Sequence, residues 1–241
     1  NSLWWTSLHK IDPEGMISTV VPPGQLWAAQ AVTAGPDGEL YVADTWNYRI
    51  ALVTPEGSVT TFAGNGYSGF SGDGGLAIYA HLGEPVDVDV GPDGTVYIAD
   101  RLNHRVRAVS PDGIIRTVAG FGSCDASVPN DGGPATEACI SDPRSISVAE
   151  DGTLYIGHVD GCRVRKVRVD GIISTVAGTG SCGYTGDGGI ATEARLSWQQ
   201  DVYVDSQGVL YIADTGNNRV RAVTPDGIIR TVAGGGDSEL V

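Results

Sequence analysis

A stretch of 18 residues, 210–227, recurs three times earlier in the chain, and this recurrence restricts the chain to a repeat architecture. The tyrosine near its start is Tyr211, and its counterparts are Tyr41, Tyr97 and Tyr155, at spacings of 56, 58 and 56 residues in chain order. A fainter copy opens the chain, with Trp4 in the tyrosine position. We therefore expect one supersecondary unit to be repeated along the chain.

Each unit contains four short apolar runs, which in the last unit span about residues 201–205, 209–213, 219–223 and 228–233. Val, Ile and Tyr are frequent in these runs, as they are in half-buried β-strands. Asp-Gly separates the first two runs, for example at Asp93, and Pro-Asp-Gly separates the last two, for example at Pro225. Both are typical of hairpin turns, in which glycine adopts positive φ. The pattern predicts an all-β fold, a β-propeller of four-stranded antiparallel blades.

The number of blades follows from the two ends of the chain. Four complete sets of runs are visible, and the N-terminus supplies three further runs at Leu3–Thr6, Leu8–Ile11 and Met16–Val20. The innermost strand of that blade is missing, and the tail at 237–241 lies where such a strand would follow. We predict five blades with one shared between the N- and C-termini, because closure pairs open strand edges. The alternative is a six-bladed ring of which this chain is a fragment.

The run that begins Tyr211-Ile-Ala-Asp-Thr-Gly-Asn-Asn-Arg resembles the NHL repeat, and its bacterial form in particular. In that form Thr-Val-Ala-Gly-x-Gly is followed by Gly-Asp-Gly-Gly-x-Ala-Thr, as at 175–180 and 186–192 here. The resemblance covers nearly the whole chain and implies one propeller domain over residues 1–241, excised from a longer chain. It is similar to domains of secreted or cell-surface bacterial proteins, including YD-repeat and teneurin-like proteins. It implies no single activity, because propellers include binding modules and enzymes.

Charge and cysteine content limit the partners and the compartment. The net charge of −14 would repel phosphate backbones, so we expect no nucleic acid partner. We expect no membrane insertion, because no apolar run approaches transmembrane length, and we expect a monomer. The four cysteines lie in loops of one face, which favours disulfides and an extracellular or cell-surface location. The preferred pairing, one of three connectivities, is Cys124–Cys139 and Cys162–Cys182.

The expected binding surface is the face that carries the long loops between units, where the inner strand of each unit begins. That position is held by Gln30, Val86, Arg144 and Gln200. The third unit departs from the repeat, since His158 replaces the aspartate found in the others. Tryptophans at 27, 46 and 198 lie in connections on the same side. We predict that a partner contacts a set of six residues: Trp27, Gln30, Arg144, His158, Trp198 and Gln200. The competing interpretation buries the tryptophans between blades and pairs Arg144 with Asp142 or Glu150.

Two repeated polar motifs have structural explanations. The first is Asp-x-x-Asn-x-Arg, as at Asp214, Asn217 and Arg219, in which we expect the side chains to satisfy a turn and pair with each other. The second is Gly-Asp-Gly-Gly, which we interpret as a glycine-rich turn whose aspartate caps amides. A calcium ion that stabilises these loops is the alternative, although no complete calcium-loop pattern is present. We otherwise predict no metal and no cofactor.

The regular repetition favours a non-catalytic extracellular interaction or scaffold module that binds protein or glycan through the long-loop face. The alternative is a propeller enzyme, a calcium-dependent lactonase or a lyase, with its site in the central channel. The channel-mouth position lacks carboxylates, and strand alternation would turn the adjacent Asp87 and Asp201 away from it. A structural spacer in a longer chain is the third interpretation.

Overall fold

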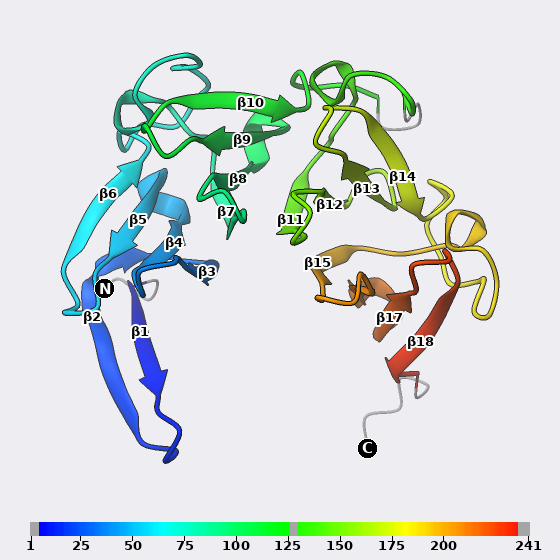
Figure 1. Cartoon of the computed structure of the whole chain (residues 1–241), viewed down its shortest axis with the longest axis horizontal. Helices are drawn as coiled ribbons and strands as arrows, with labels where there is room; N and C mark the ends of the chain where they lie inside the picture. The colour runs from blue at the N-terminus through cyan, green and yellow to red at the C-terminus, as the bar shows by residue number, and fades with distance from the viewer. Residues whose placement is uncertain (1–4, 126–129, 236–241) are drawn as a thin grey trace. The chain divides into compact units, whose positions relative to one another are not determined.

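A computed structural model of the chain describes residues 5–125 and 130–235 and shows one two-stranded and four four-stranded antiparallel sheets (Figure 1). The two-stranded sheet consists of β1 (Trp5–Ile11) and β2 (Ile17–Trp27). The next two sheets consist of β3 (Ala31–Ala34), β4 (Leu40–Asp44), β5 (Arg49–Val53), β6 (Val59–Ala63), and of β7 (Pro85–Val90), β8 (Val96–Asp100), β9 (Arg105–Val109), β10 (Ile115–Ala119). The last two consist of β11 (Pro143–Val148), β12 (Leu154–His158), β13 (Arg163–Val167), β14 (Ile173–Ala177), and of β15 (Gln199–Val204), β16 (Leu210–Asp214), β17 (Arg219–Val223), β18 (Ile229–Gly234).

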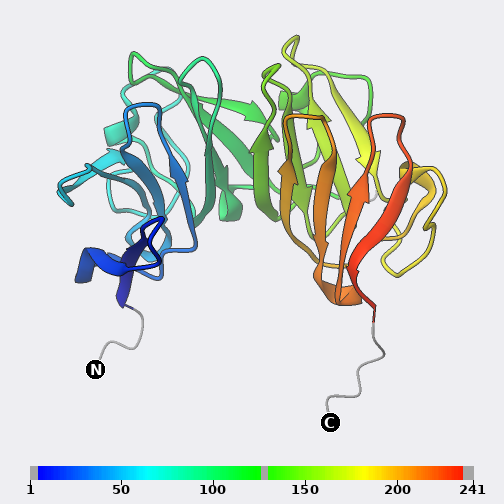
Figure 2. The same ribbon diagram turned by 60° about the horizontal axis from the view of Figure 1, so that its bottom comes forward.

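Each four-stranded sheet follows chain order, so the predicted blade is confirmed (Figure 2, where the last sheet runs from orange to red). The chain divides into two compact units, one with the sheets from β1 to β8 and one with the sheets from β11 to β18, while β9 and β10 contribute residues to both. Within each unit, small and branched side chains such as Ala43, Ile98 and Ile212 form the core. The five sheets agree with the predicted five blades.

The N-terminal sheet differs from the prediction. Leu3–Thr6 and Leu8–Ile11 were expected to be separate strands, but β1 runs unbroken from Trp5 to Ile11 and pairs only with β2 in the described residues. The pairing register shifts on both sides of Leu8, which means that the irregularity is absorbed as a bulge. Ser7 has no neighbouring glycine or proline that would reverse the chain there. The tail predicted to complete this blade lies outside the described residues.

The inner strands of three sheets begin with a β-bulge. In β15, Gln199 pairs with Asp214 and Asp201 pairs with Ala213, which leaves Gln200 as the extra residue. Val86 and Arg144 are the corresponding extra residues in β7 and β11. A bulge interrupts the alternation of side chains along a strand. Asp87 and Asp201 directly follow the bulge residues, so side-chain alternation does not turn them away from the channel-mouth position. That prediction is wrong.

The Gly-Asp-Gly-Gly loops cover the outer edge of the sheet that follows each of them. Leu76 forms an isolated antiparallel bridge with Ile114, and Ile190 forms the same bridge with Ile228. Backbone hydrogen bonds flank the bridges, for example from Gly74 N to the Ile115 carbonyl at 2.8 Å. An uncovered edge strand would present unpaired amides to other chains. Much of the extra loop length therefore protects an edge.

Candidate binding site

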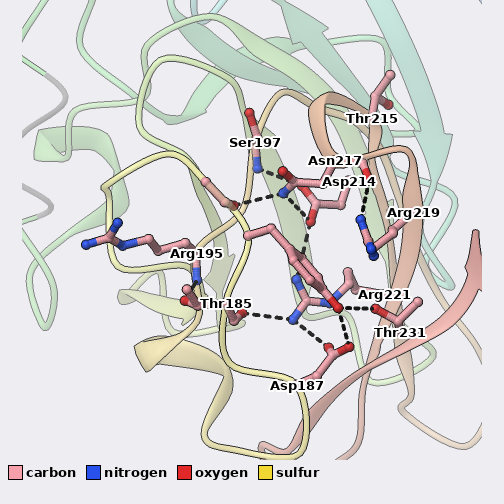
Figure 3. Close-up of polar contacts among 12 residues, drawn as sticks. Thr185, Asp187, Arg195, Ser197, Asp214, Thr215, Asn217, Arg219, Arg221 and Thr231 are labelled. Carbon is pink, nitrogen blue, oxygen red and sulfur yellow. Dashed lines mark hydrogen bonds and ion pairs between the residues drawn. The ribbon is translucent and has the colours of Figure 1, made fainter. Parts of the chain in front are cut away.

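A buried aspartate ends the second strand of three sheets and joins two connections. One carboxylate oxygen of Asp214 accepts a hydrogen bond from Ser197 N at 2.6 Å, and the other accepts one from Asn217 Nδ2 at 2.8 Å (Figure 3). Asp44 and Asp100 make the same two kinds of contact. The loop before the inner strand is thereby fixed to the turn after the second strand. This confirms the structural interpretation of the aspartate and asparagine of the motif.

The arginine that pairs with this aspartate differs between the sheets. Arg49 Nε lies 2.7 Å from Asp44, as the motif predicts. In the last sheet Arg221, two residues beyond the motif arginine, lies 3.3 Å from Asp214, while Arg219 Nη1 bonds to the Asn217 carbonyl. The prediction for Arg219 is wrong because the guanidinium that reaches the buried carboxylate comes from inside the sheet, where Arg221 is fully buried.

The aspartates of the Gly-Asp-Gly-Gly loops pair with these buried arginines. The nitrogen–oxygen distances are 2.5 to 2.7 Å for Arg107–Asp73, Arg165–Asp131 and Arg221–Asp187. Each of these aspartates forms charge-assisted hydrogen bonds to an arginine, a contact that the prediction of amide caps did not include. Among the described residues, no group of three or more His, Cys, Asp or Glu side chains could hold a metal ion. Calcium binding by these loops stays a prediction.

The third four-stranded sheet replaces the aspartate contacts with different packing. His158 is buried and its ring nitrogens have no hydrogen-bond partner within the described residues. A Cβ added to Gly161 would collide with His158 Cε1, so the buried imidazole requires a glycine at this position. Both predicted disulfides are present, Cys124–Cys139 and Cys162–Cys182. The assignment of His158 to a binding surface is wrong because its side chain is buried.

The burial of His158 makes stability depend on pH. Burial, and then the charges of Arg165 and Arg163, lower its pKa from 6.5 to about 3. The unfolded chain therefore binds the extra proton between pH 6.5 and 3, and stability is lost as the pH falls through this window. We expect His158 to account for a loss of about 2 kcal/mol between pH 7 and pH 5. Denaturant midpoints measured at both pH values test this, with His158→Gln expected to remove the loss and exposed His9→Gln to keep it. An unchanged pH dependence in His158→Gln would contradict the assignment.

Three tryptophans, two exposed and one half-buried, form a cluster in the unit that contains β1. The Trp27 ring centroid lies 6.0 Å from that of Trp5 and 5.6 Å from that of Trp46. Trp27 and Trp46 meet edge to face at 81°. Trp5 and Trp27 are 42% and 37% exposed. We call Trp5, Trp27 and Trp46 the tryptophan cluster; its central backbone is fixed because Trp27 N donates to Asp44 at 2.7 Å.

Two grooves have Trp5 in their walls. The first has a volume of about 570 Å³ and is lined by Trp5, Thr6, Ser7, Ala28, Ala29, Gln30 and Trp46. The second has a volume of about 700 Å³, and its lining includes Gln25, Arg49, Asn65 and Tyr79. Of the predicted site residues, Gln30 lines the first groove, whereas Trp27 lines neither groove and contacts the rings of Trp5 and Trp46. Trp5 was not predicted as a site residue, because it lies inside a run that was predicted to be a strand.

The other predicted residues lie in the second unit. Trp198 is 61% exposed and has a left-handed backbone with φ of 52°, which is unusual for a bulky residue. Gln200, the bulge residue, is exposed, whereas the neighbouring Gln199 is buried. Arg144 Nε lies 3.1 Å from Asp142, as the competing interpretation expected. That Trp198, Gln200 and Arg144 contact a partner stays a prediction.

Successive four-stranded sheets, each made from one repeat and three of them with a buried aspartate at the same strand end, define an NHL-repeat β-propeller. The model of the Teneurin NHL domain matches residues 25–110 and 114–185, and the NHL repeat model matches residues 200–223. The chain belongs to the teneurin NHL domain family. The resemblance to the NHL repeat that the sequence shows therefore reflects membership of this family.

Similar proteins agree with this assignment. Teneurin-4 of Mus musculus is 32% identical over 87% of this chain, and Teneurin-m of Drosophila melanogaster is 30% identical over 80%. The chain spans 8% of the length of each. A virginiamycin B lyase from Staphylococcus aureus superposes with a TM-score of 0.60 at 17% identity, covering 93% of this chain and 62% of the lyase. An auxiliary nutrient binding protein from Bacteroides thetaiotaomicron gives 0.69 at 16%, covering 97% and 53%. These two likenesses show the shared fold alone.

Proposed function

We propose that the domain is a non-catalytic extracellular interaction module that binds a protein or glycan partner through the tryptophan cluster. The observation that carries this proposal is that three tryptophan side chains meet at the surface beside an open groove. Tryptophans are enriched among the side chains that contribute most to binding energy, since a large ring is desolvated at little cost in conformational entropy.

The network around Asp44 supports a binding role for this cluster. Asp44 holds the backbone of Trp27, and its second oxygen accepts hydrogen bonds from Asn47 and Arg49. A partner would therefore meet a ring whose backbone is already fixed, which reduces the entropy lost on binding. The motif that is structural in three of the sheets would have an additional positioning role in this one.

The two disulfides support the extracellular location. Disulfides persist in oxidising compartments and are rare in the cytosol. The relation to teneurins, of which the chain spans 8%, supports a domain that works as part of a longer polypeptide. Within the described residues, no helix is both long and apolar enough to cross a membrane.

A binding array, used with a variant that lacks the indole side chain of Trp27, tests the proposal. The fluorescently labelled chain is applied to printed extracellular proteins and glycans, and affinities of the hits are measured in solution. We expect Trp27→Ala to weaken binding by about 30-fold, the equivalent of about 2 kcal/mol. Tyr203→Ala removes a more exposed aromatic side chain, on β15, and is expected to change affinity less than about twofold. Unchanged affinity in a folded Trp27→Ala variant would overturn the proposal.

A further inference from the structure

The polar lining of the first groove is uncharged. Its polar side chains are Thr6, Ser7 and Gln30; Thr6 Oγ1 accepts a hydrogen bond from Ala29 N and Ser7 Oγ bonds to His9 Nε2, each at 3.0 Å, while the amide of Gln30 can both donate and accept. The second groove includes one charged side chain, Arg49. Its guanidinium is occupied by Asp44, Thr61 and the Gln25 carbonyl at 2.7 to 3.1 Å. The chain carries a net charge of −14, which disfavours anionic ligands near its surface.

The dimensions of the grooves match a small ligand better than a protein surface. Volumes of about 570 and 700 Å³ fall within the roughly 300–1,000 Å³ typical of small-molecule sites. A stable protein interface instead covers about 800 Å² on each partner. The perpendicular rings of Trp27 and Trp46 form a corner, in which one ring can stack on a flat apolar face while the other borders its edge.

We infer that the ligand of the tryptophan cluster is a neutral oligosaccharide that lies across Trp5 and places sugar units in both grooves. This inference rests on the proposed function and narrows its partner to one chemical class. A pyranose ring has an apolar C–H face that fits against an indole, and equatorial hydroxyls that fit neutral donors and acceptors. Gln30 is exposed and stands in the first groove, where its amide reaches hydroxyls at the rim. Trp5 lines both grooves, so its ring can contact sugar units in each of them.

Calorimetric titration of the full chain tests the ligand class. The probes are neutral oligomers of glucose, galactose, mannose and N-acetylglucosamine with two to six units, and heparin-derived and polygalacturonate oligomers as acidic counterparts. We expect at least one neutral series to bind with a Kd between about 10 µM and 1 mM. Its affinity should change less than twofold between about 50 and 500 mM NaCl, because no charge pair forms. Binding confined to acidic oligomers, or weakened strongly by salt, overturns the inference.

Three variants assign the binding to this site. Trp27→Ala is expected to weaken the neutral series about 30-fold. Gln30→Ala, which removes an exposed side chain with little packing, is expected to weaken it about tenfold. Trp5→Ala should abolish the gain in affinity from two to six units that the wild type shows. If neutral oligomers do not bind while Trp27-dependent binding to an arrayed protein persists, this inference fails and the proposed function stands. If Trp27→Ala and Gln30→Ala bind the neutral series as the wild type does, this inference fails, and the proposed function fails as well only if Trp27→Ala also binds the arrayed partners as the wild type does.

Discussion

Replacement of Asp214 by alanine is expected to lower the free energy of unfolding by about 3–5 kcal/mol. The carboxylate is fully buried and satisfies Ser197 N, Asn217 Nδ2 and the buried guanidinium of Arg221. Its removal leaves three donors with fewer acceptors, and the cost of leaving buried polar groups unsatisfied exceeds the value of an average hydrogen bond. Arg221 keeps its contact with Asp187, which prevents a larger loss.

Equilibrium unfolding in urea, followed by circular dichroism, measures this change from the midpoint at constant slope. Asp226→Ala is the matched control, because that aspartate lies in an exposed turn and accepts a hydrogen bond only from Thr224 in the described contacts. We expect the control to cost less than about 1 kcal/mol. A loss below about 1 kcal/mol for Asp214→Ala would mean that the aspartate does not hold the two connections together.

Removal of the Cys162–Cys182 disulfide is expected to cost about 3 kcal/mol, because it frees a segment closed over 20 residues. The third four-stranded sheet lacks the aspartate and asparagine that fix the turn in its neighbours, and we expect the disulfide to compensate by tying this turn to the loop before β15. Cys162 has a left-handed backbone with φ of 42°, so asparagine is the suitable replacement there. The variant is Cys162→Asn with Cys182→Ser, measured by thermal and urea unfolding.

A rescue experiment distinguishes this compensation from a general effect of cross-linking. Adding His158→Asp and Gly161→Asn to the variant without this disulfide restores the side chains found in the other sheets. We expect this addition to recover about 1 kcal/mol or more, since the new carboxylate can accept from the Ser141 backbone amide and the new asparagine. No recovery, or a loss below about 1 kcal/mol on removing the disulfide, would contradict the compensation.

The strands and the disulfides were predictable because their signals are local or repeated. Hairpin turns at Asp93 and Pro225 divide the apolar runs, and repetition at the tyrosine spacing identifies equivalent runs. The cysteine pairing followed from placing all four in loops of one face. The unbroken strand β1 was not predictable in the same way, because a bulge near Leu8 has no distinctive residue signature.

One contact could have been found from the sequence and was not. Each Gly-Asp-Gly-Gly aspartate precedes its arginine by 34 residues, as Asp187 precedes Arg221. Ala51 stands at the arginine position in the first unit, which has no such loop before it. The presence of both the Gly-Asp-Gly-Gly loop and the later arginine in a unit therefore predicts the ion pair between them. The tryptophan cluster could not be found this way, because Trp5, Trp27 and Trp46 occupy three different positions of the repeat.

The indole N–H resonances of the chain's five tryptophans test most directly whether partners bind at the tryptophan cluster. Each resonance is assigned in the ¹⁵N-labelled protein by a Trp→Phe substitution and followed during titration with the tightest ligand from the array. We predict that the resonances of Trp5, Trp27 and Trp46 move together and saturate with one Kd, equal to that from calorimetry. Resonances of these three that stay fixed at saturating ligand would contradict the claim.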